Sequence, residues 1–280
     1  MSVDSLTVGM ALPECYRSAT PPAVPHENRI HDGDIARTLG FKAALVPGVT
    51  VYAWMTPPVV EALGVEWLER GTFSVRFTKP VYYGERATVQ ARVVDRTGES
   101  VTIEVTASNS AGESCATATM GLTPGSDSKP PDPAAYPAAA LPAERPVADR
   151  RRLETMEILG TPELRLSEDT AHGFLSEVDE SLPLYGEANA PVHPAIYLNQ
   201  ANRAFERNVR VSPWIHVESR GRHLGRCHLG ERLFTRGKVK RLFERKGHEF
   251  VELDLLLVAT GGRPVASLSH TAIYQLRHPD

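Results

Sequence analysis

Two histidines and an asparagine lie close together near the N-terminus, in the segment HENRIH at residues 26–31. A neutral imidazole accepts a proton near pH 7, and histidine is the commonest general base, so His31 is the first candidate for proton transfer. Asn28 can hold a water molecule through its amide without titrating itself. His26 adds a second imidazole. The alternative is that these side chains only cap a loop before a helix.

The strongest helix signal follows this segment, in the apolar block Gly48–Leu63. A helix that is apolar on nearly every side is buried. Gly48 at its start would let a ligand carbonyl approach the free N–H groups, where the helix dipole favours developing negative charge. Pro57 and Pro58 interrupt the block and predict a kink, or a second helix beginning at Pro57.

The order of these residues resembles the motif of the MaoC-like, hotdog-fold (R)-specific enoyl-thioester hydratases. That motif reads Asp-x-Asn-Pro-x-His, followed by an Ala, a Gly-Phe pair and His-Gly-Met. Asn28, His31, the pair Gly40-Phe41 and Gly48 match it. Three positions depart from this motif: His26 stands for Asp, Arg29 for Pro and Pro47 for the His before the glycine.

The resemblance implies a division of roles. In the family, Asp and His activate one water that adds across the double bond of a trans-2-enoyl thioester, and N–H groups near the start of the central helix polarise the thioester carbonyl. We therefore expect catalytic positions at His31, Asn28 and His26. The expected oxyanion and substrate-binding positions are Gly48, Val49, Pro47 and Phe41. Because a protonated His26 offers neither an acceptor nor a counter-charge, a carboxylate from Glu27, Asp32 or Asp34 could substitute for it.

Strands follow the helix block. Apolar residues alternate with polar ones over residues 73–77, 89–93 and 101–107, with turn signals at Gly84, Thr97-Gly98 and Ala111-Gly112. These alternations predict one antiparallel sheet after the helix.

The same order of elements recurs later in the chain. The segment Tyr83–Arg86 has a counterpart in Leu229–Arg232, 146 residues on. The same offset places His193 opposite Pro47 and an apolar helix at residues 195–205. Between the halves, residues 123–149 are rich in Pro and Ala and too poor in bulky apolar residues to build a core.

The repeat indicates an internal duplication of an α+β unit. The resemblance supplies the name of this fold, a tandem or double hotdog with two antiparallel sheets, each wrapped around a central helix. We expect an N-terminal unit over residues 1–122, a linker over 123–149 and a C-terminal unit over 150–280. The resemblance also allows a homodimer of such double units.

Composition excludes several function classes. The net charge of −3 gives no reason to expect nucleic-acid binding. No stretch approaches the ~18 apolar residues that span a membrane, and no dinucleotide-binding, P-loop or serine-hydrolase motif occurs. Three widely spaced cysteines and the lack of a secretory signal predict a cytoplasmic protein. No metal or cofactor is expected.

A local excess of positive charge bears on the partner. Residues 201–250 carry 13 Lys and Arg against 5 Glu and no Asp. Such a patch could meet the phosphates of coenzyme A or the acidic face of an acyl carrier protein. The alternative is that these side chains point outward along solvated strands.

The expected function is hydration and dehydration of an enoyl or 3-hydroxyacyl thioester of coenzyme A or a carrier protein, a lyase reaction of fatty acid or polyketide metabolism. Two alternatives remain open: a non-catalytic acyl-thioester-binding or partner subunit, favoured by His26 in place of the acid, and a thioesterase. Hotdog thioesterases generally need a carboxylate on or near the central helix, and Glu61 is the only acidic residue in the first helix block.

Overall fold

The computed structural model describes residues 3–21, 26–123, 130–187 and 189–277. The elements of the first half are β1 (Cys15–Ser18), α1 (Gly33–Thr38), α2 (Gly48–Met55), α3 (Pro57–Arg70), β2 (Thr72–Phe77), β3 (Arg86–Thr97), β4 (Ser100–Ser108) and β5 (Ser114–Leu122). Those of the second half are α4 (Arg150–Glu154), β6 (Glu163–Arg165), α5 (Glu168–Glu177), α6 (Ala195–Asn208), β7 (Ile215–His223), β8 (Arg232–Arg245), β9 (His248–Ala259) and β10 (Arg263–Gln275). Short 3₁₀ turns lie at Val3–Ser5, Arg29–His31, Pro133–Ala135, Pro183–Gly186 and Thr260–Gly262.

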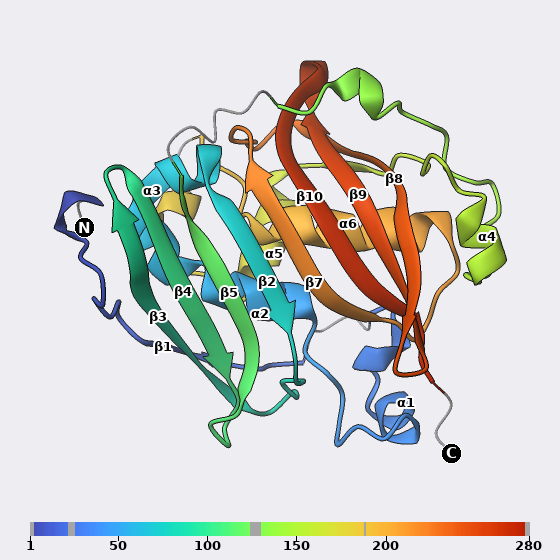
Figure 1. The fold of residues 1–280 in the computed structure, drawn as a ribbon, viewed down its shortest axis with the longest axis horizontal. Coiled ribbons are helices and arrows are strands. Elements are labelled where there is room, and N and C mark those ends of the chain that lie inside the picture. The colour runs from blue at the N-terminus through green and yellow to red at the C-terminus, as the bar shows by residue number, and fades with distance from the viewer. Residues whose placement is uncertain (1–2, 22–25, 124–129, 188, 278–280) are drawn as a thin grey trace.

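All described strands form one antiparallel sheet in the order β1-β3-β4-β5-β2-β7-β10-β9-β8-β6 (Figure 1). The two halves join through β2 and β7, from Thr72 opposite Arg222 to Arg76 opposite Glu218. Each half therefore contributes five neighbouring strands, and the pairing covers two edges that would otherwise be open to aggregation.

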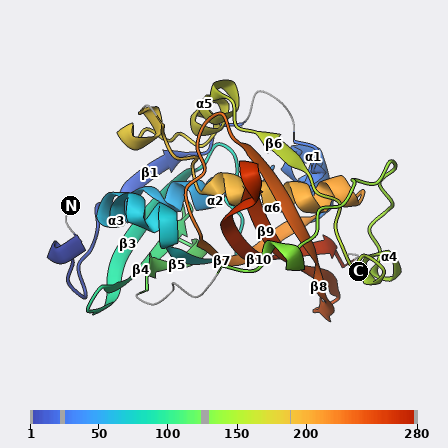
Figure 2. The same cartoon turned by 90° about the horizontal axis from the view of Figure 1, so that it is seen from above.

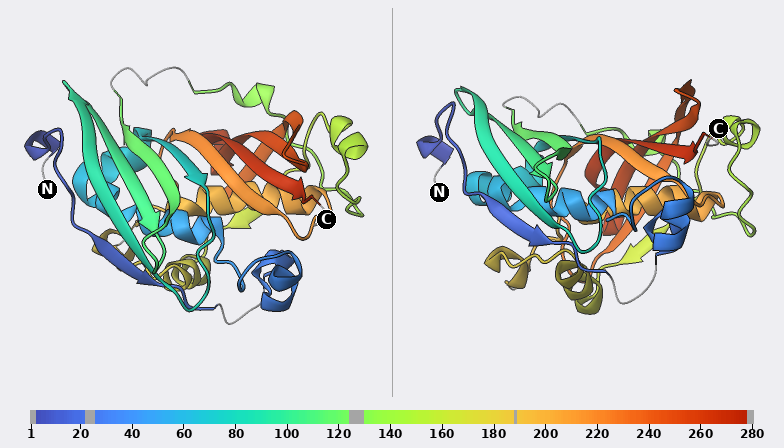
Figure 3. Two further views of the ribbon diagram at one scale, coloured as in Figure 1. Left: turned by 60° about the horizontal axis from the view of Figure 1, so that its bottom comes forward. Right: turned by 90° about the horizontal axis from the view of Figure 1, so that it is seen from below.

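The helices lie along the concave side of this sheet, where α3, α2 and α6 follow one another (Figure 2). Residues 49–55 of α2 are all buried, as the apolar block predicts. Strands present alternate residues to the helices; on β4 these are Val101, Ile103, Val105 and Ala107. In contrast, α1 projects from the body of the molecule (Figure 3).

The prolines after α2 start a new helix rather than kink the old one. Pro57 and Pro58 occupy the first turn of α3, where a missing N–H costs no hydrogen bond. The hydroxyl of Thr56 donates to the carbonyl of Ala53 and does not cap α3. Gly64 interrupts α3 with φ of 66°, a conformation that glycine adopts without steric cost.

The Pro/Ala-rich segment between the halves is partly described. Its residues 124–129 lie outside the described residues. After them the chain runs along the second half, where the Tyr136 hydroxyl donates to Asp254 at 3.0 Å and Val147 bridges Arg210. The exact boundaries of the two units stay a prediction.

Candidate functional site

A cavity of about 1090 Å³ lies where the two halves meet, at the start of α2 and beside α5, α6 and β7. The residues predicted from the sequence all line it: His26, Asn28, His31, Phe41, Pro47, Gly48 and Val49. The second half adds polar side chains to its wall: Ser176, Glu177, Asn199, Asn202, Arg203 and Glu206. The cavity is therefore a joint product of both halves.

His31 is held in one tautomer. Its Nδ1 lies 2.7 Å from the carbonyl oxygen of Leu45, which can only accept, so Nδ1 carries the hydrogen and Nε2 keeps a lone pair. Burial lowers the pKa of His31 to about 4, against the opposing effect of the Leu45 hydrogen bond. The imidazole is thus neutral at pH 7 and can accept a proton at Nε2.

His26 lies beside it, with the two ring centroids 4.8 Å apart. Its Nε2 is 3.3 Å from the hydroxyl of Tyr83, and burial lowers its pKa. The position that is acidic in the hydratase motif therefore holds a second neutral imidazole.

Asn28 is largely committed to the main chain of the other half. Its Nδ2 donates to the Trp214 carbonyl at 2.9 Å, and its Oδ1 accepts from the N–H groups of Trp214 and Ile30 at 3.2 and 3.4 Å. An amide has two N–H hydrogens and two carbonyl lone pairs, so one N–H remains for a water. These contacts anchor the loop that carries His31, and water binding by Asn28 stays a prediction.

The start of α2 has the free donors that a developing oxyanion needs. Gly48 and Val49 open the helix, and the first intrahelical bond is from Val51 to the carbonyl of Pro47 at 3.1 Å. A Cβ on Gly48 would lie 3.2 Å from the Phe77 ring and 3.3 Å from His216 Nδ1. A larger residue here would have to displace these rings by a few tenths of an ångström, so close packing favours glycine in addition to any contact with a ligand.

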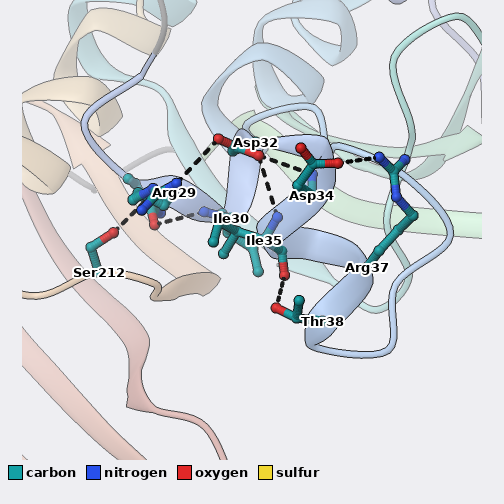
Figure 4. A network of polar contacts seen from close by, with 9 residues as sticks. Arg29, Ile30, Asp32, Asp34, Ile35, Arg37, Thr38 and Ser212 are labelled. Carbon is teal, nitrogen blue, oxygen red and sulfur yellow. Dashed lines mark hydrogen bonds and ion pairs between the residues drawn. The ribbon is translucent and has the colours of Figure 1, made fainter.

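The three carboxylates closest in sequence to His31 have other partners, and Figure 4 shows those of Asp32 and Asp34. Asp32 accepts from the N–H groups of Asp34 and Ile35 and so caps α1. The Asp34 carboxylate pairs with Arg37 at 2.5 Å. Glu27 pairs with Arg145 at 2.5 Å.

A buried chain of polar side chains lies beside the cavity, and sequence reasoning missed it. His216 Nε2 is 2.8 Å from the Ser219 hydroxyl, which is 2.9 Å from His270 Nδ1. Burial lowers the pKa of His270 to about 3. Burial also lowers the pKa of His216 well below 6.5. The nearby His270 lowers the pKa of His216 further, while a hydrogen bond with the main chain of Glu218 opposes the shift.

His216 and His223 lie within the basic stretch of residues 201–250, yet they are only 7% and 2% exposed. The cause is a bulge. The register between β7 and β10 shifts at Thr271/Ala272, so that His216 and Ser219 are both buried although they are three positions apart. A strict period of two could not have found this pair.

Two absences hold for the described part of the chain. No group of three His, Cys, Asp or Glu side chains there is placed to hold a metal ion. Within the same ranges, no helix is long and apolar enough to cross a membrane.

Comparison with known proteins agrees with the fold. Residues 71–116 match the family model of the Thioesterase superfamily. No curated protein matches the sequence.

Solved structures extend the likeness to the whole chain. A protein from Chloroflexus aurantiacus J-10-fl, assigned as a MaoC domain dehydratase, superposes with a TM-score of 0.70 at 10% identity, over 99% of this chain and 97% of its own. The Mycobacterium tuberculosis protein RV0216, which has a double hotdog fold, gives 0.65 at 16% identity over 97% of both chains. A Lactobacillus plantarum protein assigned as an oleoyl thioesterase gives 0.53 at 10% identity, over 96% of this chain and 98% of its own. This chain therefore has the double hotdog fold, and the similarity of its fold to that of the protein assigned as a MaoC domain dehydratase extends over nearly all of it.

Proposed function

We propose that the protein is a hydratase/dehydratase of enoyl and 3-hydroxyacyl thioesters. The observation that carries the proposal is His31, a neutral imidazole whose free Nε2 belongs to the same cavity wall as the donors at the start of α2. A base and an oxyanion site in one cavity are the two groups that addition of water to an enoyl thioester requires.

In the proposed reaction, His31 Nε2 takes a proton from water while the water oxygen bonds to C3. The electron pair of the C2=C3 bond moves toward the thioester carbonyl, whose oxygen accepts hydrogen bonds from the N–H groups that open α2. The imidazolium then returns its proton to C2. The sum is addition of one water, and the reverse sequence is dehydration.

The thioester carrier is proposed from the positive charge beside the cavity. Six of the 13 cations of the basic region pair with acids among the described residues; Arg226, for example, pairs with Glu69 and Lys240 with Glu252. Arg203 is exposed and lies at the cavity wall. It is therefore the cation that we propose meets a phosphate of coenzyme A or of a carrier-protein arm.

The test is hydration of trans-2-enoyl-CoA substrates of increasing chain length. The reaction is measured as the loss of the enoyl-thioester absorbance. We expect His31→Ala to lower kcat by ~10²-fold or more, the usual loss for a general base. The exposed His172 supplies the matched control, and His172→Ala should retain full activity. A wild type that binds acyl-CoA yet hydrates no enoyl thioester would leave the binding-subunit alternative in its place.

A thioesterase activity is the second candidate, favoured by one observation. Glu206 lies on α6, a central helix, and lines the cavity, whereas Glu61 on α3 is exposed. Burial raises the pKa of the Glu206 carboxyl, although the Trp214 indole donates to it at 3.1 Å. Release of free coenzyme A from saturated acyl-CoA, abolished in Glu206→Gln, would support this activity; no release would exclude it.

A further inference from the structure

The neutral pair His26 and His31 leaves a charge unbalanced in the proposed reaction. When His31 takes a proton, the imidazolium forms in a buried place where burial already disfavours it. A carboxylate at the cavity wall would offset that charge and would accept a hydrogen bond from the attacking water. The carboxylates next to His31 in sequence are engaged elsewhere, so such a carboxylate would have to come from another part of the cavity wall.

Three carboxylates line the cavity in the described residues: Glu27, Glu177 and Glu206. Glu27 is paired with Arg145, and Glu206 accepts from the Trp214 indole. Glu177 has no hydrogen-bond or ion-pair partner among the described residues. It is thus the free carboxylate of this wall.

Glu177 also lies on the side of the cavity that carries the histidines. Burial and the negative charge of Glu177 raise the pKa of Tyr83, whose hydroxyl is 3.3 Å from His26 Nε2. The His26 ring is in turn adjacent to His31. The Glu177 side chain is exposed to solvent, and the partial burial of its carboxyl raises the pKa of Glu177.

The helix that carries Glu177 is anchored at its start by a cap and near its end by a buried phenylalanine. Ser167 caps α5 by accepting from the N–H of Thr170 at 3.2 Å, and the buried Phe174 packs with its ring centroid 5.6 Å from that of His193. Phe174 lies about one turn before Glu177 and also lines the cavity, so its packing holds the last turn of α5, with Ser176 and Glu177, at the cavity wall.

We propose that Glu177, contributed by the second half, supplies the carboxylate that the first half lacks at position 26. This inference rests on the proposed hydratase function. Glu177 accepts a hydrogen bond from the water hydrogen that stays with the oxygen, while His31 takes the other; no bond to the carboxylate forms or breaks. Its negative charge offsets the transient imidazolium. The catalytic set is then split between the halves of the duplicated chain.

The experiment compares hydration of trans-2-enoyl-CoA by the wild type and by the near-isosteric variant Glu177→Gln. We expect kcat to fall by ~10²-fold or more with KM little changed, because the carboxylate acts on the water and not on the acyl chain. Glu177→Asp should recover part of the loss. Glu168→Gln, an exposed acid in the first turn of the same helix, is the control and should retain full turnover.

A second variant tests the stated reason. His26→Asp in the Glu177→Gln background places a carboxylate at the motif position and should restore much of the lost kcat, which a merely structural role of Glu177 would not predict. An active wild type with an equally active Glu177→Gln overturns this inference and leaves the hydratase intact. A wild type without hydration overturns both.

Discussion

His26 and His31 share a cavity wall, yet their environments give them different tasks. His31 has its tautomer fixed by the Leu45 carbonyl, whereas His26 faces a hydroxyl, which can donate or accept. His31 is therefore the better-defined proton acceptor. His26 lies where a carboxylate would stabilise the imidazolium, and this difference can be tested by one substitution.

We expect His26→Asp in the otherwise wild-type chain to raise kcat for enoyl-thioester hydration by about tenfold. The gain is smaller than the ~10²–10⁴ of a complete acid/base group, because Glu177 already provides a carboxylate. The measurement is kcat for one enoyl-CoA at saturation. His26→Asn has a similar volume and no charge, and it should show no gain; an equal gain in both variants would count against an electrostatic cause.

At the level of elements, His193 of the second half, opposite Pro47 in the repeat, makes contacts that connect the two halves. His193 is completely buried at the start of α6, and its Nδ1 accepts from the Ala195 N–H at 3.2 Å. Its Nε2 lies 3.3 Å from both Glu180 Oε2 and the Thr56 hydroxyl of the first half. Burial alone would raise the pKa of Glu180, but the adjacent His193 imidazole and hydrogen bonds from the Leu182 and Ser181 N–H groups outweigh it and lower the pKa.

Removal of His193 should therefore destabilise the fold. In His193→Ala the buried Glu180 carboxylate loses its partner, and we expect the free energy of unfolding to fall by about 3 kcal/mol or more, as for other buried pairs that lose one member. Urea denaturation at pH 7.5 measures it. The double variant His193→Ala/Glu180→Gln removes the charge as well and should recover part of the loss. Equal stabilities of the single and double variants would show that the carboxylate is solvated once His193 is gone.

For the whole molecule, the repeat in the sequence predicted the duplicated fold, which the comparisons with double hotdog proteins confirm. Val46 N–H donates to the Val81 carbonyl, and 146 residues later Val192 donates to Cys227 in the same way. The bridge between Leu45 and Tyr82 likewise recurs between Pro191 and His228. Strand alternation and the offset of 146 residues, which grows to 150 after the longer hairpin of the second half, were sufficient for this part.

The offset fails before the central helices. The first half has a 3₁₀ turn at Arg29–His31 and then α1 between β1 and α2, whereas the second half has α5 and then a 3₁₀ turn at Pro183–Gly186 between β6 and α6. One offset applied to the whole chain therefore could not predict the position of Glu180. Glu177 could not have been found either, since its relation to His31 depends on how α5 packs across the junction of the halves.

The number of buried histidines makes stability depend on pH. Burial lowers the pKa of His31 and His223 to about 4, of His270 to about 3, and of His193 and His216 below 6.5. In the unfolded chain each titrates near ~6.5. The unfolded state therefore binds more protons between pH ~6.5 and the lowered values, so the stabilising contribution is complete above pH ~6.5 and is lost as the pH falls.

We accordingly expect the free energy of unfolding to be flat above pH 7 and to decrease below 6.5, by up to about 1.4 kcal/mol per pH unit for each of these histidines. Denaturant titrations at pH 7.5, 6.5 and 5.5 measure the slope. His223→Gln retains a donor for the Trp67 carbonyl, which His223 Nδ1 now contacts at 2.7 Å, but removes one titrating group. The free energy of unfolding of this variant should depend on pH less steeply than that of the wild type, by the contribution of one histidine. An unchanged slope would mean that His223 is protonated equally in both states, and that the acid sensitivity arises from other groups.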